Sequence, residues 1–287
     1  MSIPGIANTP DLLRGHPCFD QAAHFRVGRI HLPVAPLCNI SCRYCVRALN
    51  EVENRPGVAS AILSPAEALA RTREAVRRDP SIHVVGIAGP GDPLANPETF
   101  ETLAAVHREL PRLAKCVSTN GLLLPDAVPR LARVGVTHLT VTVNAVTEEV
   151  GKAFYRGHVF RLLRLRQFAG IRAAAQHGIV VKVNTVLVPE LNARELVELA
   201  LLVRELGASL MNIIPLKPQG AMAGYRAPTC AELEAARDRC EAIIPQFRLC
   251  RQCRADAAGI PGRPDHGAAH RLAWREGLAD ATPACHF

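Results

Sequence analysis

Short runs of β-branched and aliphatic residues alternate along the chain with longer amphipathic stretches. Each run has the length of a buried strand and is followed by apolar residues at helical spacing. Six runs are predicted to be strands: 29–35, 82–88, 115–119, 137–143, 179–188 and 209–215. Six stretches are predicted to be helices: 64–78, 97–110, 125–135, 160–178, 192–207 and 229–244.

Local signals support these helix boundaries. The first predicted helix opens with Ser64, Pro65 and Glu67, which form an N-cap, a first-turn proline and a capping box. The last opens with a second capping box, Thr229 and Glu232. Three of the helices between them end at a glycine, the residue favoured where a helix stops.

Repeated strand–helix units predict a parallel sheet with right-handed crossovers. Six units are too few for a closed eight-stranded barrel, so we expect an α/β fold of the partial (βα)6 barrel type. In such folds the chemistry gathers where strands end. Cysteine-containing or polar segments follow the first four predicted strands, at 38–45, 88–93, 118–121 and 144–145.

The chain divides into four predicted parts. Residues 1–28 form an N-terminal extension and residues 29–245 form the barrel. Residues 246–262 carry a CxxC pair and are expected to close the barrel mouth together with the extension. Residues 263–287 form a tail without a repeated pattern.

Composition narrows the class of protein. No apolar run approaches the roughly 20 residues of a membrane span, and the start lacks a signal-peptide pattern, so we expect a cytoplasmic protein without membrane contact. The net charge of +8 is interpreted as solvated helix faces, with an anionic partner as the alternative. Aromatic residues make up only 4%, which leaves no stacking platform for nucleic acid. Ten cysteines in a cytoplasmic chain favour metal or redox chemistry over disulfides.

Three of these cysteines, Cys38, Cys42 and Cys45, follow the first predicted strand within eight positions. A structural zinc site takes four ligands. A [4Fe–4S] cluster has four iron corners, so three cysteines on one loop leave one iron open for a substrate. Zinc with a distant fourth ligand and unrelated structural cysteines are the alternatives, although the polar loop disfavours the second.

The CxxxCxxC spacing, with Tyr44 before the last cysteine, resembles the radical S-adenosylmethionine (SAM) superfamily. The resemblance implies a [4Fe–4S] cluster whose open iron chelates the amino and carboxylate groups of SAM. An electron from the cluster then gives methionine and a 5′-deoxyadenosyl radical. The resemblance also implies that the turn formed by Gly89, Pro90, Gly91 and Asp92 binds the methionyl amine. Four polar residues at or near strand ends are predicted to line the same pocket, with turn formation as the alternative for the asparagines: Ser118, Asn120, Asn144 and Asn184.

A second resemblance covers about residues 15–262. The segments HPCF, CxxxCxxC, NRPGV, CVSTNGL and, above all, CRQCRADAAG are similar to the NifB family, which builds the carbide-containing iron–sulfur precursor of the nitrogenase cofactor. The resemblance implies two further [4Fe–4S] clusters as substrates. These are fused in the barrel with an added sulfur and a carbon from the methyl group of SAM. It also implies transient partners that donate clusters or carry the product, and we expect a monomer.

Four cysteines and a histidine are predicted to hold the substrate clusters. Cys18, Cys250 and Cys253 offer three thiolates for one cluster, with a zinc knuckle as the alternative for the CxxC pair. Cys116 ends the third predicted strand, where a small core cysteine is the alternative. His31 lies opposite the apolar face of the first strand, and the resemblance implies a cluster-ligating histidine there. A merely hydrogen-bonded histidine is the alternative, and two other histidines remain candidates: His16 and His24.

The chain departs from the NifB pattern after the cysteine loop. The family has a further cluster-ligating cysteine there, whereas this chain has Asn50 and Glu51 and is one residue shorter. Either His31 and Cys116 hold the first substrate cluster alone, or Glu51 supplies an oxygen, or the site is used differently.

Two neighbouring residues, Glu53 and Arg55, match an acid and an arginine of the family. They are predicted to handle protons or orient SAM, with a surface ion pair as the alternative. Two other functions stay open. One is a radical SAM enzyme with an auxiliary cluster that acts on an organic or peptide substrate. The other is an iron–sulfur carrier or scaffold, against which the glycine turn argues.

Overall fold

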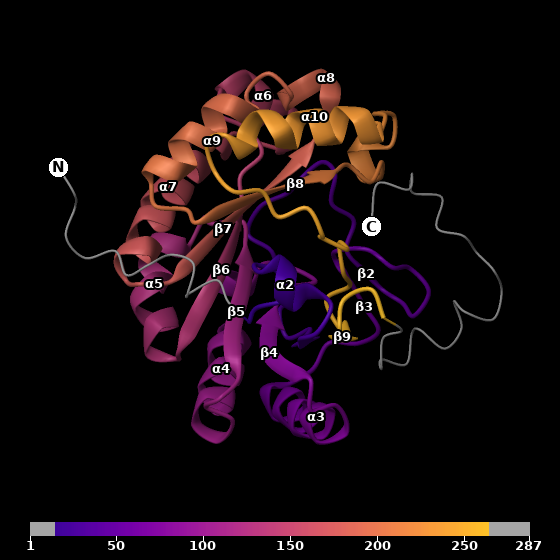
Figure 1. Cartoon of the computed structure of the whole chain (residues 1–287), viewed down its shortest axis with the longest axis vertical. Coiled ribbons are helices and arrows are strands. Elements are labelled where there is room, and N and C mark those ends of the chain that lie inside the picture. The colour runs from indigo at the N-terminus through magenta and orange to yellow at the C-terminus, as the bar shows by residue number, and fades with distance from the viewer. Residues whose placement is uncertain (1–14, 264–287) are drawn as a thin grey trace.

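A curved sheet forms the centre of the protein, seen in a computed structural model that describes residues 15–263. Its strands are β1 (Gly28–His31), β4 (Ile82–Ile87), β5 (Ala114–Thr119), β6 (Val136–Thr142), β7 (Val180–Leu187), β8 (Leu210–Pro215) and β9 (Ala258–Gly259). They lie in the order β8-β7-β6-β5-β4-β1-β9, with β9 antiparallel to β1 and the other pairs parallel (Figure 1). A separate pair joins β2 (Ala48–Leu49) and β3 (Val58–Ala59).

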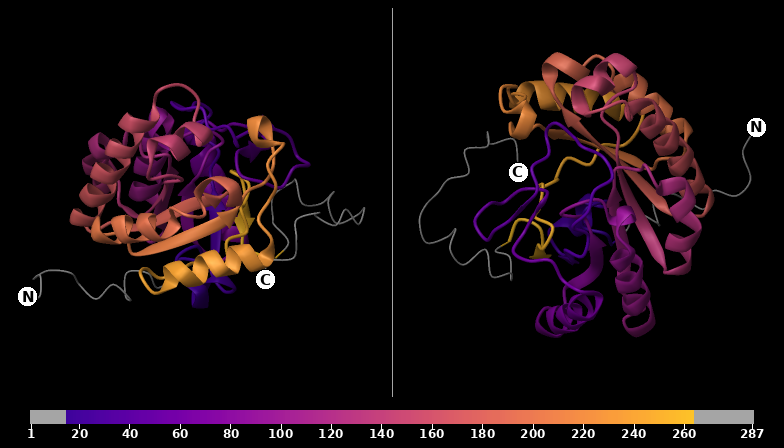
Figure 2. Two further views of the ribbon diagram at one scale, coloured as in Figure 1. Left: turned by 90° about the horizontal axis from the view of Figure 1, so that it is seen from above. Right: turned by 180° about the vertical axis from the view of Figure 1, so that it is seen from behind.

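Helices cover the convex side of this sheet (Figures 1 and 2). They are α3 (Pro65–Arg78), α4 (Pro97–Glu109), α5 (Leu124–Arg133), α6 (Glu148–Phe154), α7 (Phe160–Gln176), α8 (Pro189–Asn192), α9 (Leu196–Glu205) and α10 (Cys230–Glu241). The short α2 (Gln21–His24) instead lies inside the half barrel, where Gln21 contacts residue 246, and 3-10 turns lie at Pro93–Ala95 and Gly220–Met222. Alternate strand residues such as Val117, Leu139 and Val181 point toward the helices and form the main core. The residues between them face the concave interior.

The predicted partial barrel of six strand–helix units is confirmed, and both capping boxes are present. Two boundaries differ. β1 ends at His31 rather than at residue 35, because Pro33 has no N–H to continue the ladder. The helix predicted over 192–207 begins only at Leu196, as α9, after the separate short helix α8, in which the buried Asn192 side chain donates to Val186 O at 2.9 Å and accepts from Val188 N at 3.0 Å.

The two terminal segments close the interior at different places. After α10 the chain follows β8, where Phe247 N donates to Met211 O at 2.8 Å. It then crosses to the other edge, where β9 pairs with β1. This strap, residues 246–259, closes the open side of the half barrel (Figure 1).

The N-terminal segment enters at the amino-terminal halves of the strands. Lys182 Nζ of β7 donates to Cys18 O at 2.7 Å, and the His16 ring lies 4.5 Å from that of His138 in β6. The expectation that both segments close the mouth is therefore refined: they cover the open side and the amino-terminal end. The predicted tail lies outside the described residues, apart from Arg263.

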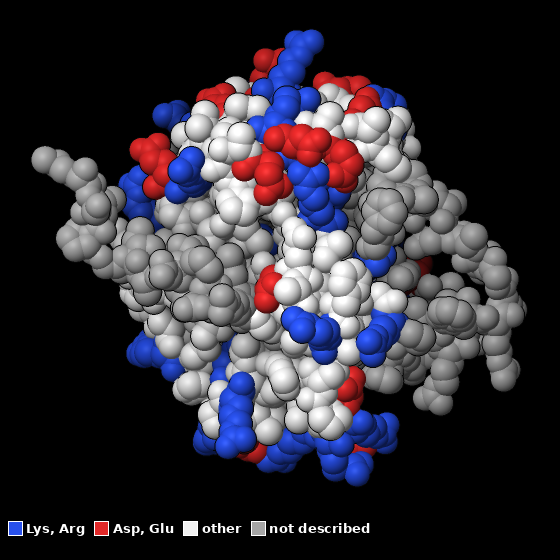
Figure 3. Space-filling model, viewed as in Figure 1, with Lys and Arg blue, Asp and Glu red and all other residues white. Residues whose placement is uncertain are grey.

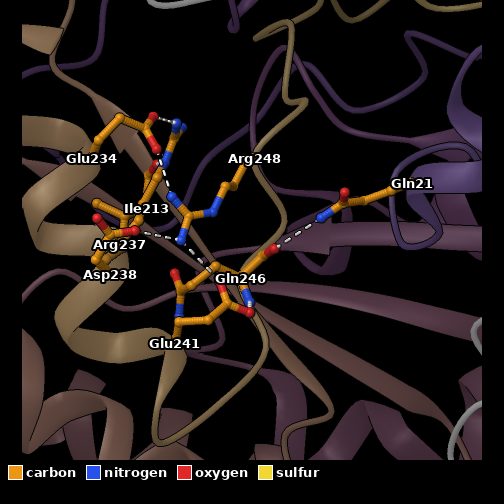
Figure 4. A network of polar contacts seen from close by, with 8 residues as sticks. All are labelled: Gln21, Ile213, Glu234, Arg237, Asp238, Glu241, Gln246 and Arg248. Atoms are coloured by element: carbon orange, nitrogen blue, oxygen red, sulfur yellow. Dashed lines mark hydrogen bonds and ion pairs between the residues drawn. The ribbon is translucent and has the colours of Figure 1, made fainter.

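An ion-pair network fastens the strap to α10 (Figure 4). The Arg248 guanidinium donates to Glu234 at 2.5 Å, Asp238 at 2.8 Å and Glu241 at 3.1 Å. Next to it, Gln21 of α2 donates to Gln246 O at 3.4 Å. The network thus holds the chain two residues before Cys250.

The charged side chains on the surface lie mainly on the helices. On the face shown in Figure 3, basic side chains gather at the lower end, where α3 and α4 lie. Many of them are paired: Arg77 lies 2.8 Å from Glu74, and Arg73 pairs with Glu109. These pairs support the interpretation of the charge as solvated helix faces. Within residues 15–263 no helix is long and apolar enough to cross a bilayer.

Candidate active site

An interior cavity of about 300 Å³ is lined by two groups of cysteines. One group is the loop of Cys38, Cys42 and Cys45, and the other is Cys18, Cys116, Cys250 and Cys253. The size of the cavity is typical of small-molecule sites. The predicted site residues that line it are Cys18, His31, Cys38, Cys42, Tyr44, Cys45, Pro90, Gly91, Asp92, Cys116, Ser118, Asn120, Asn184, Cys250 and Cys253. Gly89, Glu53, Arg55 and Asn144 lie outside this lining.

The cysteine loop, residues 38–45, lies beyond the carboxyl end of β1. Cys38 and Cys42 are partly buried, Cys45 is exposed, and all three are free thiols. The backbone of the loop is held firmly, since Arg43 N donates to Phe154 O at 2.8 Å and Cys45 N to Cys42 O at 3.2 Å. Burial raises the pKa of Cys42, and partial desolvation together with the neighbouring Cys38 raises that of Cys45, so both thiols carry protons that must leave when iron binds.

The turn after β4 supports the start of the cysteine loop. Gly91 N donates to Ala35 O at 2.6 Å, and a Cβ on Gly91 would lie only 2.1 Å from Leu37 O. Only glycine fits this approach. Asn96, which the sequence pattern does not single out, is buried and bonds Leu37 through both ends of its amide, at 2.9 and 3.1 Å.

The Asp92 carboxylate accepts its hydrogen bonds from other groups of the protein. Its buried carboxylate accepts from Thr119 Oγ1 at 2.9 Å, Asn120 N at 2.6 Å and Leu94 N at 2.9 Å. Burial raises the pKa of Asp92, and these donors oppose the rise. The residue therefore joins the β4 turn to the end of β5, while its contact with SAM remains a prediction.

Asn120 and Ser118 reach the cavity from the end of β5. The Asn120 amide donates to Asn39 Oδ1 at 2.7 Å and lies 3.9 Å from Cys38 Sγ. This contact places an amide donor beside a thiol of the cysteine loop. An N–H group so close to a sulfur is suited to stabilise a thiolate ligand.

The other two asparagines differ in role. Asn144 donates to the Tyr44 hydroxyl at 3.0 Å and to the Tyr155 hydroxyl at 3.1 Å, so it positions Tyr44 from behind the cavity wall. Asn184 accepts from Asn212 at 2.9 Å and faces the cavity.

We define the inner donor set as Cys18, His31, Cys116, Cys250 and Cys253, which come from the N-terminal segment, β1, β5 and the strap and line the cavity together. Three of its thiols contact one apolar cluster around Phe19 and Phe247. The fourth, on Cys253, accepts from the Arg29 guanidinium at 3.2 Å. Burial raises the pKa of Cys18 to about 11 and that of Cys116 to about 12, and the Lys182 ammonium opposes both rises.

His31 is presented to the cavity as a neutral imidazole. Its Nδ1 lies 3.0 Å from Arg254 O, and because a carbonyl only accepts, Nδ1 carries the proton and Nε2 keeps its lone pair. Burial and the nearby Arg29 lower the pKa of His31 to about 4. His24 shows the same pattern, with Nδ1 on Pro17 O at 2.6 Å and a buried Nε2 that has no partner, and it too lines the cavity. Both imidazoles are therefore possible iron ligands.

The segment with the missing cysteine lies against the strap. Arg254 donates to Asn50 O at 2.8 Å and Glu53 O at 2.6 Å, and it forms a buried ion pair with Asp256 at 2.8 Å. The Glu51 side chain is exposed and does not line the cavity.

Glu53 and Arg55 form an ion pair, and Arg55 also bonds Val46 O next to the cysteine loop. The structure thus shows the ion pair that was the alternative for these two residues. Their role with protons or SAM remains a prediction.

The described donors are not arranged as a single-ion site. Within residues 15–263, no three His, Cys, Asp or Glu side chains are gathered closely enough to hold one metal ion. In a [4Fe–4S] cluster each thiolate binds a different iron, so the ligands stand further apart than around zinc.

Comparison with known proteins agrees with this geometry. The Radical SAM superfamily profile matches residues 32–203. FeMo cofactor biosynthesis protein NifB of Methanocaldococcus infernus is 46% identical over 262 residues, which cover 87% of this chain and 86% of that protein. The chain belongs to the NifB family. NifB of Methanocaldococcus jannaschii is 45% identical, with 85% and 86% covered, and NifB of Klebsiella pneumoniae is 40% identical, with 96% of this chain and 63% of that protein covered.

Solved structures support the fold. SuiB of Streptococcus suis matches 75% of this chain and 46% of its own, with a TM-score of 0.58 at 15% identity. Methylornithine synthase PylB matches 90% and 78%, with a TM-score of 0.52 at 14% identity. This member of the NifB family is thus a radical SAM enzyme with a partial barrel, and a [4Fe–4S] cluster and SAM are its cofactors.

Proposed function

We propose that this NifB-family protein acts in biosynthesis of the nitrogenase FeMo cofactor. It would fuse two [4Fe–4S] clusters into an eight-iron precursor with a carbide from SAM and an added sulfur. One observation carries the proposal: a cysteine loop and a separate inner donor set line the same cavity. One auxiliary cluster for an organic substrate needs about three or four further ligands, whereas two substrate clusters need more, and the inner donor set offers five donors with His24 beside them.

Each group of residues is assigned a role according to its place in the cavity. Cys38, Cys42 and Cys45 would hold the SAM cluster, which supplies the electron that splits SAM. The glycine turn lines the cavity beside them through Pro90, Gly91 and Asp92, and it would bind the methionyl part of SAM. Cys18, Cys250 and Cys253 would hold one substrate cluster.

The first substrate cluster would be held by Cys116 together with neutral imidazole, from His31 or His24. Glu51 is the weaker candidate, because it is exposed outside the cavity lining. A site with few ligands suits a cluster that is consumed. Cluster donors and carriers of the product are the transient partners that this reaction requires.

The test is anaerobic reconstitution followed by reaction with SAM that carries a labelled methyl carbon. We expect the label in an eight-iron product together with 5′-deoxyadenosine. Uncoupled 5′-deoxyadenosine without a labelled cluster would instead favour an organic or peptide substrate. Iron binding without any cleavage of SAM would favour a carrier or scaffold.

A further inference from the structure

A buried lysine lies inside the inner donor set. Lys182 is only 4% exposed, although it comes from the middle of β7. Its Nζ donates to Cys18 O at 2.7 Å and lies 4.5 Å from the Phe19 ring centre and 5.2 Å from that of Phe247. A carbonyl and two ring faces carry no net charge, and no carboxylate in residues 15–263 forms an ion pair with this ammonium.

The surrounding cavity does not supply the missing negative charge. Arg29 and Arg251 also line the cavity. Asp92 is the one carboxylate among the described residues of the lining, and it is bonded to the end of β5. Burying a cation without a counter-charge is unfavourable, so the surroundings of Lys182 are suited to an anionic occupant.

We propose that Lys182 compensates the negative charge of the iron–sulfur cluster held by Cys18, Cys250 and Cys253, and thereby retains and orients that cluster. This inference rests on the proposed function, in which the inner donor set binds a cluster. Thiolates and sulfides make such a cluster anionic once its ligands are bound. The backbone bond to Cys18 O fixes the ammonium beside the first of the three ligands.

Charge compensation by Lys182 would change the reduction potential and the stability of the cluster, whereas packing alone would change neither. A fixed positive charge near a redox centre stabilises its reduced form, which is the more negative one, and so raises the reduction potential. The same attraction slows loss of the cluster. A lysine that only fills space between two phenylalanine rings would affect neither property once its volume is preserved.

The experiment uses the full chain with Cys38→Ala, Cys42→Ala and Cys45→Ala, so that only the inner donor set binds iron. Lys182→Met keeps the volume and removes the charge, whereas Lys182→Arg keeps the charge. Lys115→Met is the matched control, because Lys115 is also a buried strand lysine, but it bonds Leu113 O at 2.9 Å outside the cavity lining. Each protein is reconstituted anaerobically, titrated potentiometrically with EPR detection, and exposed to an iron chelator.

We expect Lys182→Met to lower the reduction potential and to release iron about tenfold faster, the size of effect typical of lost outer-sphere contacts. Lys182→Arg and Lys115→Met should resemble the parent. Lys182→Gln replaces Lys182→Met if the latter does not fold. If the Lys182→Met protein binds its cluster with the same reduction potential and iron-release rate as the parent, the proposed role of Lys182 is wrong, while the cluster assignment stands. The same conclusion follows if Lys115→Met shifts both quantities as much as Lys182→Met does. A parent that binds no iron overturns both this inference and the cluster assignment beneath it.

Discussion

At the scale of single residues, His31 combines burial with a fixed tautomer. Its pKa of about 4 lies below its ordinary value of 6.5. The unfolded chain therefore binds more protons between these values, so the apoprotein loses stability as the pH falls from about 6.5 to about 4. His31→Gln should remove up to about 3 kcal/mol of this loss, at about 1.4 kcal/mol per pKa unit. Urea denaturation of the apoprotein at several pH values measures it.

The exposed His83→Gln serves as the control for this comparison. Wild-type protein and His83→Gln should lose stability equally on acidification. If His31→Gln also shows the full loss, the His31 imidazole does not titrate as the geometry requires.

Asp92 accepts from three buried or partly buried donors, two at the end of β5 (Thr119 Oγ1 and Asn120 N) and one in its own turn (Leu94 N), and so connects the glycine turn to β5. Asp92→Ala leaves these donors without an acceptor and should lower the free energy of unfolding by about 2 kcal/mol, as expected for unsatisfied buried groups. Thermal and urea denaturation of the apoprotein measure the change, with the exposed Glu101→Gln as the control. A loss of SAM affinity with unchanged stability would instead support a direct contact with SAM.

At the scale of elements, the strap depends on its attachment to α10 (Figure 4). Arg248 bonds three carboxylates of that helix. Exposed pairs contribute up to about 1 kcal/mol, so Arg248→Met should make amide exchange in residues 246–253 roughly fivefold faster. Hydrogen exchange with mass spectrometry detects this. Arg239→Met on the same helix is the control, and equal exchange in both variants would mean that the network does not hold the strap.

Local pattern could predict the six strands and most helices, because each needs only its own periodicity and capping residues. It could not predict the path of the strap. β9 has two residues, and the pairing of Gln246 with Met211 depends on chain segments far apart in sequence. α6 is also missed, because seven residues with an internal glycine give little helical pattern.

The candidate site, too, could be predicted from the sequence only in part. The spacing of Cys38, Cys42 and Cys45 predicted one part of the cavity lining, whereas Cys116 and His31 were predicted mainly from the resemblance to the NifB family. Spacing alone could not show that Asn144 bonds two tyrosine hydroxyls behind the wall. In the sequence VKVNTV, Lys182 looks like an ordinary strand residue. Its buried environment depends on the distant Cys18 segment, to whose backbone the ammonium donates a hydrogen bond.

At the scale of the whole molecule, the cavity is assembled from distant parts of the chain. The cysteine loop belongs to the first strand–helix unit, whereas the inner donor set is drawn from the N-terminal segment, two strands and the strap. Both ends of the described chain are therefore needed to complete one site. Arg254 adds a link, because it ties the strap to the segment that follows the cysteine loop.

The two groups of donors should nevertheless bind iron independently, because they are held by different backbone segments. Replacing Cys38, Cys42 and Cys45 together by alanine should remove about four iron atoms per chain, one cubane, and abolish cleavage of SAM. Replacing Cys18, Cys250 and Cys253 should remove a similar amount while uncoupled cleavage of SAM persists. Iron quantification and EPR of the anaerobically reconstituted variants measure both effects. If either triple variant empties both ends of the cavity, the donors form one coupled site, and the assignment of separate clusters to them is wrong.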